Sequence, residues 1–75
     1  MSYNGWRNWD TWNCHLWLSN KDGAYRTMRA WGRSGVPLDA FIAVATGGLE
    51  AMGNPDCIDY GKVDWEEVRQ AFAEE

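Results

Sequence analysis

The residues of this chain best suited to metal or nucleophile chemistry are His15, Cys14 and Cys57. A structural zinc site needs four ligands, usually in paired C-x-x-C or H-x-x-x-H spacings, and this chain offers three candidates and no such pair. Cys14 and His15 are adjacent, so on a helix their side chains point about 100° apart. We therefore predict no metal site, no cofactor and two free cysteines that pack as small apolar residues.

Catalytic arrangements are equally hard to build from this sequence. A Ser-His-Asp triad needs a nucleophile and an orienting acid beside the histidine, and no pattern places them near His15. Gly47-Gly48 lacks the preceding strand and the following lysine of a phosphate-binding loop. Glu66 and Glu67 are neighbours, and neighbouring residues of a helix do not face one site. The sequence therefore predicts that the chain is not an enzyme.

Charge is separated along the chain and suggests a binding surface. Residues 1–35 carry a net charge of +3 and residues 36–75 a net charge of −7, which together give −4. Five carboxylates of the second half fall within one stretch of twelve residues, namely Asp56, Asp59, Asp64, Glu66 and Glu67. Such a patch can compete with nucleic acid for a basic protein groove, so we predict a partner-binding site with an exposed aromatic, Trp31, as its anchor.

A basic stripe gives the alternative interpretation. Arg26, Arg29 and Arg33 are spaced by three and four residues, which places them on one helix face. With Arg7 and an exposed tryptophan they would form a stacking groove for single-stranded nucleic acid. The acidic half would repel phosphates unless it lies on the far side. Ordinary solvated surface explains either charged set equally well, so all three interpretations stay open at this point.

Four helical segments must position these residues. Apolar residues recur at spacings of three and four over 9–19, 24–33 and 38–52, and again from Asp64 onward, with a turn expected at 20–23. No segment alternates with a period of two for long enough to indicate a strand. We expect an all-α, compact three- to four-helix single domain over residues 1–75. Its predicted core is Trp12, Leu16, Met28, Phe41, Ile42, Leu49, Val68 and Phe72.

Capping signals mark the ends of these helices. Asn8 is a natural N-cap for the first helix, and Thr11 is placed to hydrogen bond back to it. Asp64 and Glu67 have the spacing of a capping box at the start of the last helix. Gly47-Gly48 weakens the middle of the helix over 38–52, but the apolar period continues across the two glycines. We therefore predict a continuous helix with another helix packed close over the bare backbone.

The opening of the chain resembles a known pattern. Residues 4–17, N-G-W-R-N-W-D-T-W-N-C-H-L-W, resemble a family of small uncharacterised proteins from phages, plasmids and archaea that begin N-G-W-x-N-x-x-T-W-x-x-x-L-W. Val63-Asp64-Trp65 resembles the V-D-W helix start near the end of those proteins. The match covers roughly the first twenty residues and the last dozen. The resemblance implies a mobile element as the source, where small acidic proteins often block host defence, including as anti-CRISPR proteins.

These observations lead to one expected function and one alternative. The first is a non-catalytic protein from a phage or mobile element that binds and inhibits a host defence complex, foremost as an anti-CRISPR protein. The alternative is a small protein that binds single-stranded nucleic acid. No segment is apolar enough to span a bilayer and no signal peptide is visible, so we expect the cytoplasm of the host cell. The surplus tryptophans, Trp17 and Trp31 among them, also make a homodimer an expectation.

Overall fold

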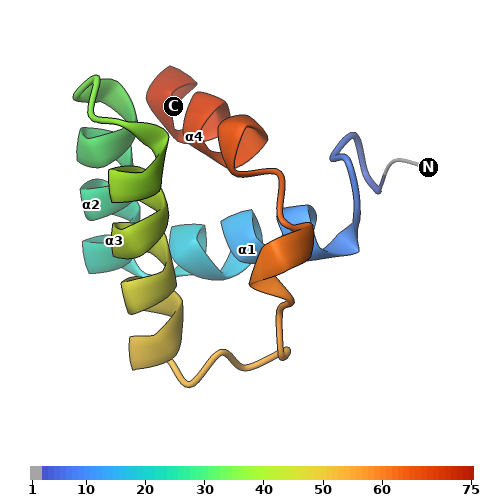
Figure 1. Ribbon diagram of the computed structural model, residues 1–75. Helices are drawn as coiled ribbons and strands as arrows, with labels where there is room; N and C mark the ends of the chain where they lie inside the picture. The colour runs from blue at the N-terminus through green and yellow to red at the C-terminus, as the bar shows by residue number, and fades with distance from the viewer. Residues whose placement is uncertain (1–2) are drawn as a thin grey trace.

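The computed structural model describes residues 3–75, which form four α-helices and one turn of 3-10 helix (Figure 1). The elements are α1 (Trp9–Asn20), α2 (Asp22–Arg33), α3 (Leu38–Ala51), η1 (Tyr60–Lys62) and α4 (Trp65–Glu74). In residues 3–75 the sole β-type pairing is an isolated bridge between Tyr3 and Trp6. The all-α prediction is confirmed. None of the helices in this part of the chain is long and apolar enough to cross a membrane.

The helices pack as an antiparallel pair crossed by the remaining two. Figure 1 shows α2 and α3 side by side, with α1 running away from them and α4 across the upper end of α2. The segment between α3 and α4 has no regular structure up to η1 and returns along the lower edge of the molecule. The start of α4 thereby reaches the start of α1, although the two are more than fifty residues apart in sequence.

The junction between α1 and α2 differs from the expected turn over 20–23. α1 continues to Asn20 and α2 begins at Asp22, so that Lys21 alone separates them in an extended conformation, with φ −107° and ψ 124°. The carbonyl of Lys21 already accepts the backbone N–H of Tyr25 at 2.8 Å, which starts α2 at once. Asp22 lies in the first turn, where a carboxylate suits the helix dipole. The predicted four-residue turn is therefore wrong.

The helix α3 is continuous through its glycine pair, as predicted. A Cβ placed on Gly48 would lie 3.3 Å from Cδ2 of Leu18, so α1 does pack close over the backbone at this point. Gly47 is different, because a Cβ there would meet nothing within 4 Å. The close-packing prediction is confirmed for Gly48 and wrong for Gly47.

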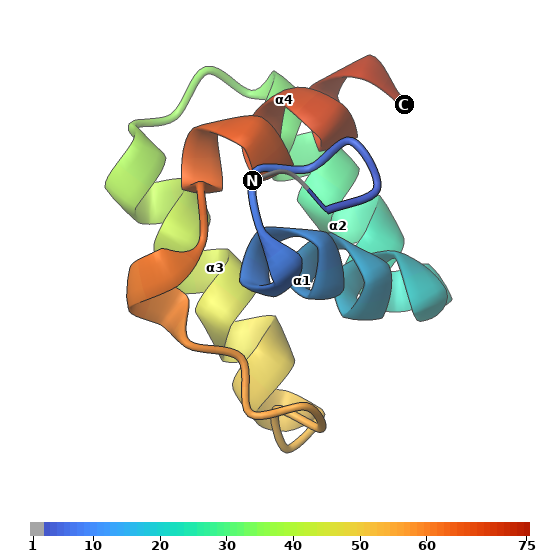
Figure 2. The ribbon, with the colours of Figure 1, turned by 90° about the vertical axis from the view of Figure 1, so that its right-hand side faces the viewer.

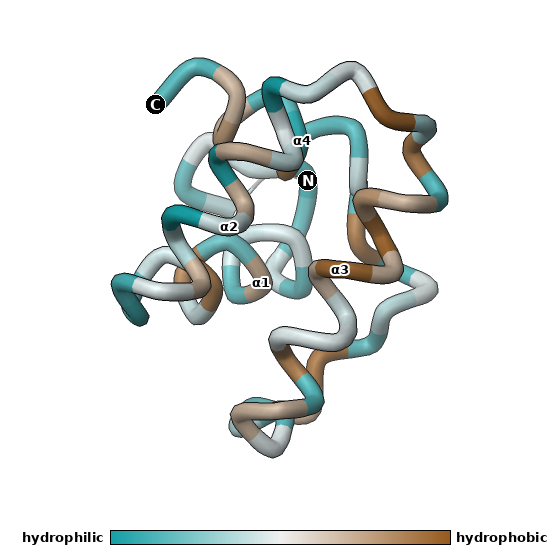
Figure 3. The backbone as a smooth tube through the Cα atoms, turned by 90° about the vertical axis from the view of Figure 1, so that its left-hand side faces the viewer, coloured by the Kyte–Doolittle hydropathy of each residue, from teal (hydrophilic) through white to brown (hydrophobic). Residues whose placement is uncertain are grey.

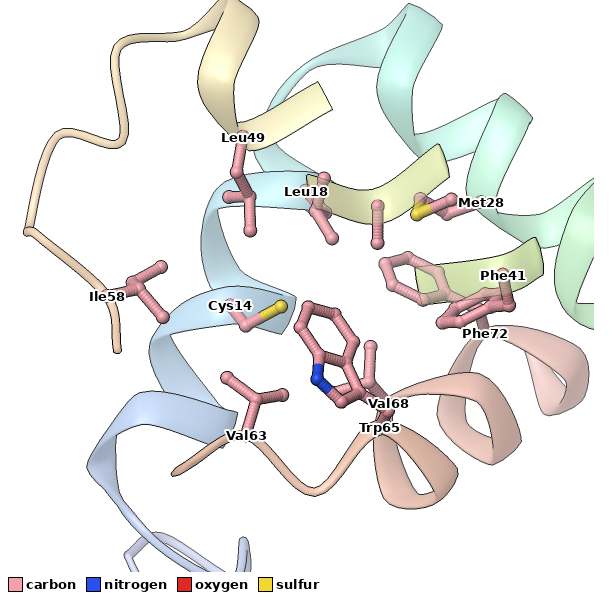
Figure 4. Close-up of a cluster of buried hydrophobic side chains, with 11 residues drawn as sticks. Cys14, Leu18, Met28, Phe41, Leu49, Ile58, Val63, Trp65, Val68 and Phe72 are labelled. Carbon is pink, nitrogen blue, oxygen red and sulfur yellow. The ribbon is translucent and has the colours of Figure 1, made fainter. Parts of the chain in front are cut away.

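The core lies where the four helices meet (Figure 4). Five predicted core residues are buried, namely Met28, Phe41, Leu49, Val68 and Phe72. Three others, Trp12, Leu16 and Ile42, are only half-buried, so their assignment to the core is wrong. Ile42 packs against the edge of the buried cluster rather than inside it.

The helix α1 turns a different face to the core than its tryptophans suggested. Its buried residues include Thr11, Cys14 and Leu18, whereas Trp9 is 40% exposed. The ring of Trp12 lies 4.9 Å from that of Tyr3, so the N-terminal segment covers it from outside. Small side chains face inward because the start of α4 comes within hydrogen-bonding distance of α1 there, which leaves no room for an indole.

Candidate binding surfaces

The N-terminal segment is a tight turn that folds back on the helices. Asn4 (φ 49°) and Gly5 (φ 87°) both have positive φ, the combination that a type I′ turn requires. Tyr3 and Trp6 exchange two backbone hydrogen bonds of 2.6 and 2.7 Å across it. Figure 2 shows this turn beside α1 and α4. The turn fixes the direction of Trp6, which then lies over His15 of α1.

His15 joins both ends of the chain to α1. Its ring is 4.7 Å from the ring of Trp6 and 4.6 Å from that of Phe72. Its Nε2 is 2.7 Å from Oε2 of Glu75. The histidine side chain is 18% exposed, so it is held mainly as a packed residue between two aromatic rings.

A chain of hydrogen bonds links the starts of α1 and α4. Oδ1 of Asn8 accepts the backbone N–H and the hydroxyl of Thr11, at 2.8 and 2.7 Å. The same hydroxyl oxygen accepts the backbone N–H of Asp64 at 2.9 Å, and Oδ1 of Asp64 accepts the N–H of Glu67. The predicted caps are confirmed. The reciprocal half of the capping box is absent, because Thr11 already takes the Asp64 N–H and Glu67 accepts the N–H of Arg7 at 2.9 Å.

Asp56 is held by two side chains of α1. Its Oδ2 accepts Nε1–H of Trp17 and Nδ2–H of Asn13, both at 2.9 Å. Both hydrogen bonds stabilise the carboxylate and lower its pKa from 3.8, and the bond from Trp17 has the larger effect. Trp17 therefore anchors the loop through its indole N–H and is half-buried. This contact does not favour Trp17 as part of an exposed apolar patch.

The other carboxylates also have partners within the chain. Oδ1 of Asp59 accepts the N–H of Gly61 at 3.0 Å. Nη2 of Arg69 donates to both carboxylate oxygens of Glu66, at 2.7 and 3.0 Å. The N–H of Asp59 donates to Oδ1 of Asp10 at 3.0 Å. The five predicted carboxylates thus sit along one loop and the first turn of α4. They support the fold as well as giving this surface its charge.

The predicted aromatic anchor lies elsewhere. Trp31 is 36% exposed on α2, in a shallow apolar depression lined also by Ala30, Ser34 and Val36. The structure therefore does not place Trp31 among the five carboxylates. Trp9 is 40% exposed and stands between Asn8 and Asp10, both of which hydrogen bond to residues of the loop before α4.

The arginines of the alternative interpretation are divided between two surfaces. Arg7 lies at the start of α4, where its Nη1 is 3.7 Å from Oδ2 of Asp64. Arg26, Arg29 and Arg33 are together on α2, as their spacing predicts. The guanidinium carbon of Arg29 lies 5.5 Å from the ring centre of Tyr25, and Nε of Arg33 donates to the carbonyl of Ala73 at 3.1 Å. The structure does not bring Arg7 into the basic face.

The two cysteines are free, as expected. Cys14 is buried in the core, and burial raises the pKa of its thiol to about 12. Cys57 is exposed in the loop, with φ 51°, so the prediction that it packs as a small apolar residue is wrong. Within residues 3–75, no group of three or more histidine, cysteine or acidic side chains is arranged to hold a metal ion.

Comparison with known sequences places the whole chain in one group. A family model described as "Family of unknown function (DUF7249)" matches residues 1–75. The chain belongs to this DUF7249 family. Neither the search of curated proteins nor the search of solved structures gave a match. The matched region includes both the N-terminal turn and α4, so the hydrogen-bonded contact between them lies within the family's unit.

Three residues of this DUF7249 chain hold or flank the acidic loop before α4, and the sequence alone did not indicate them. Asp10 and Asn13 reach the loop from α1 through the hydrogen bonds described above, and Trp9 is exposed beside them. Asp10 lies in the first turn of α1, where a carboxylate suits the helix dipole, so the sequence offers a local explanation for this residue without the contact. Its contact with Asp59 spans 49 residues, and no local pattern indicates such a pair.

Proposed function

We propose that this protein is a non-catalytic inhibitor from a phage or other mobile element that acts in the host cytoplasm. It occupies the basic, nucleic-acid-binding groove of a host defence complex, foremost a CRISPR effector. The observation that carries the proposal is the charge of residues 54–67, called here the acidic segment. It contains five carboxylates and one lysine, so its net charge of −4 equals that of the whole chain.

The acidic segment is held rigidly although much of it is irregular. The side chain of Asn54 bonds both the N–H and the carbonyl of Ile58, at 3.0 and 3.2 Å, and Ile58 itself is buried. The hydroxyl of Tyr60 donates to Glu50 of α3 at 2.6 Å, and burial together with this bond raises the pKa of Tyr60 to about 12. A charged surface that is already ordered loses little entropy on binding, which favours affinity.

The five carboxylates divide between binding and support. Asp56, Asp59 and Glu66 are exposed and so available to a partner's lysines and arginines. Asp64 and Glu67 are half-buried and hold the start of α4. Trp9, rather than Trp31, takes the role of aromatic anchor, because it is exposed at this end of the molecule. The charges mainly raise the association rate, and a buried indole contributes more of the affinity.

A pull-down from host lysate with the tagged protein, followed by mass spectrometry, tests the proposal. We expect recovery of a nuclease or surveillance complex that contains a basic groove. Recovery of nucleic acid without such a complex would contradict the proposal and favour the alternative, a single-stranded nucleic-acid binder that uses the arginines of α2.

Two triple variants then locate the contact. D56N/D59N/E66Q removes three charges of the acidic segment but leaves each of these side chains one acceptor oxygen for its internal hydrogen bonds. D22N/D39N/E74Q removes three exposed charges elsewhere and serves as the matched control. We expect the first variant to lose the complex and the control to retain it, with unchanged circular dichroism in both. Full binding by the first variant would rule out the acidic segment as the contact.

A further inference from the structure

Trp9, the first residue of α1, is an exposed indole beside the acidic segment. In the described part of the chain, no other aromatic ring and no guanidinium group stacks on it. Asn8, just before it, donates to the carbonyl of Lys62 at 2.8 Å. Asp10, just after it, accepts the backbone N–H of Asp59 at 3.0 Å. The uncovered indole and the charged loop therefore belong to one surface.

Two carboxylates of the acidic segment are attached to α1 within about one helical turn of this indole. Asn13, one turn after Trp9, donates from Nδ2 to Asp56 at 2.9 Å, and Asp59 is held through Asp10. Both carboxylates are exposed. Oδ1 of Asn13 is buried and has no hydrogen-bond partner among the described residues, so the fold leaves an acceptor over at this point. This surface thus combines an open aromatic ring with negative charge.

A guanidinium group suits both parts of such a surface. It is planar, stacks on aromatic rings and presents several donors to a carboxylate, whereas an ammonium group is a compact and strongly hydrated point charge. Both contacts occur within this chain. The guanidinium carbon of Arg29 lies 5.5 Å from the ring centre of Tyr25, and Nη2 of Arg69 donates to both oxygens of Glu66. The surface at Trp9 offers the same two elements to an arginine from outside the chain.

The chain's own neighbouring arginine is engaged elsewhere. Arg7 lies two residues before Trp9, but its Nη1 is 3.7 Å from Oδ2 of Asp64 at the start of α4. The acidic segment has a net charge of −4, so a positively charged occupant is the complementary one. Arginine is also the side chain with which nucleic-acid-binding proteins most often hold phosphates and bases.

We propose that Trp9, Asp56 and Asp59, called here the Trp9 face, recognise arginine rather than lysine in the partner's basic groove. One arginine side chain stacks on the indole of Trp9, and guanidinium groups donate to the two carboxylates. The proposal rests on the proposed function for the kind of partner and adds the side chain that is recognised. It makes the aromatic contact a source of specificity, whereas the charge alone would accept any basic groove.

The second exposed indole provides a matched control. Trp31 is 36% exposed and Trp9 40%, but the depression around Trp31 is lined by the uncharged Ala30, Ser34 and Val36. Figure 2 shows the start of α1 beside the N-terminal turn, whereas Figure 3 views the molecule from the opposite side, on which α2 and α3 lie. Substitution of Trp31, which belongs to α2, therefore removes an indole without changing the Trp9 face.

Two basic peptides test the proposal. An oligo-arginine and an oligo-lysine peptide of equal length carry the same charge, and their affinities are measured by NMR titration. We expect the wild-type protein to bind the arginine peptide about fivefold more tightly. Trp9→Ala should lose this preference and Trp31→Ala should keep it, with unchanged circular dichroism in both. Equal affinities of the wild-type protein for the two peptides would overturn the proposal, as would a preference that survives Trp9→Ala.

The same titration locates the contact. The indole N–H signal of Trp9 should shift with the arginine peptide, and the arginine methylene protons next to the guanidinium should move upfield because they lie over the ring. D56N/D59N should weaken the binding of both peptides. An indole signal of Trp9 that stays unchanged at saturation would contradict stacking.

The inference and the proposed function fail separately. If the pull-down recovers a defence complex but the two peptides bind equally, arginine recognition is wrong and the proposed function stands. If the preference for arginine depends on Trp9 but no complex is recovered, the Trp9 face is confirmed and the proposed function is wrong.

Discussion

The two sides of this molecule are held together by different forces. On one side, the N-terminal turn, the acidic segment and the starts of α1 and α4 are joined by hydrogen bonds between short polar side chains and the backbone, as in the Asn8–Thr11–Asp64 chain. On the other side, helices pack through apolar groups and bare backbone, as at Gly32 of α2. Exposed charges on the first side therefore also support the fold. On the outward face of α2, in contrast, a Cβ added at Gly23 would meet no other atom within 4 Å.

Removing the hydroxyl of Thr11 should have the largest effect. Thr11→Val keeps the shape but deletes a donor to Asn8 and the acceptor for the N–H of Asp64, at a fully buried position. We expect a loss of about 3 kcal/mol in the free energy of unfolding, measured with urea, because an unpaired N–H remains next to the core. Thr46→Val is the matched control, since its hydroxyl only bonds back within α3. Equal losses in both variants would show that hydrogen bonding does not hold the polar side.

A pair of glycine substitutions addresses the packed side. A Cβ on Gly32 would lie 3.2 Å from the carbonyl oxygen of Arg69 and 3.3 Å from the N of Ala73, and these are backbone atoms that cannot turn aside. Gly32→Ala should destabilise the protein by about 2 kcal/mol. Gly47→Ala meets open space and should stabilise α3 by about 1 kcal/mol. Thermal unfolding of both variants gives the comparison, and shifts of the same sign would contradict this description of the packing.

The smallest effect concerns Asp56. Hydrogen bonds from Trp17 and Asn13 lower its pKa from 3.8 in the folded protein, so its contribution to stability is complete above about pH 3.8. That contribution is lost as the pH falls through the lower folded pKa. The indole N–H signal of Trp17, followed by NMR, should therefore shift with a midpoint below 3.8, and Asp56→Asn should abolish the shift. A midpoint at or above 3.8 would mean that the carboxylate lacks these bonds in solution.

Local signals predicted much of the fold. The apolar period located all four helices, and Asn8 and Asp64 marked two helix starts correctly, because capping depends on residues only three positions apart. The buried face of α1 was predicted wrongly, since the large apolar side chains of Trp12 and Leu16 were assigned to the core and the small polar Thr11 was not. Small residues are inside because α4 begins against them, and a contact between residues 11 and 64 leaves no local trace in the sequence.

The sequence predicted which carboxylates make up the candidate site but not which side chains they contact. The five carboxylates are close in sequence, so their clustering on one loop and the first turn of α4 followed directly. Their internal partners did not, because Asn13, Trp17 and Asp10 come from α1. Trp31 was assigned to the same surface since exposure can be estimated from a helical pattern, whereas the relative placement of two helices cannot.

Hydrogen exchange of the protein, alone and bound to the captured defence complex, tests the central claim most directly. The proposed function predicts slower exchange at the backbone amides of residues 56–66 and at the indole of Trp9 in the complex. The amides of α2 should exchange equally in both states. Protection confined to α2, with residues 56–66 unchanged, would contradict the account and identify the arginine face as the contact.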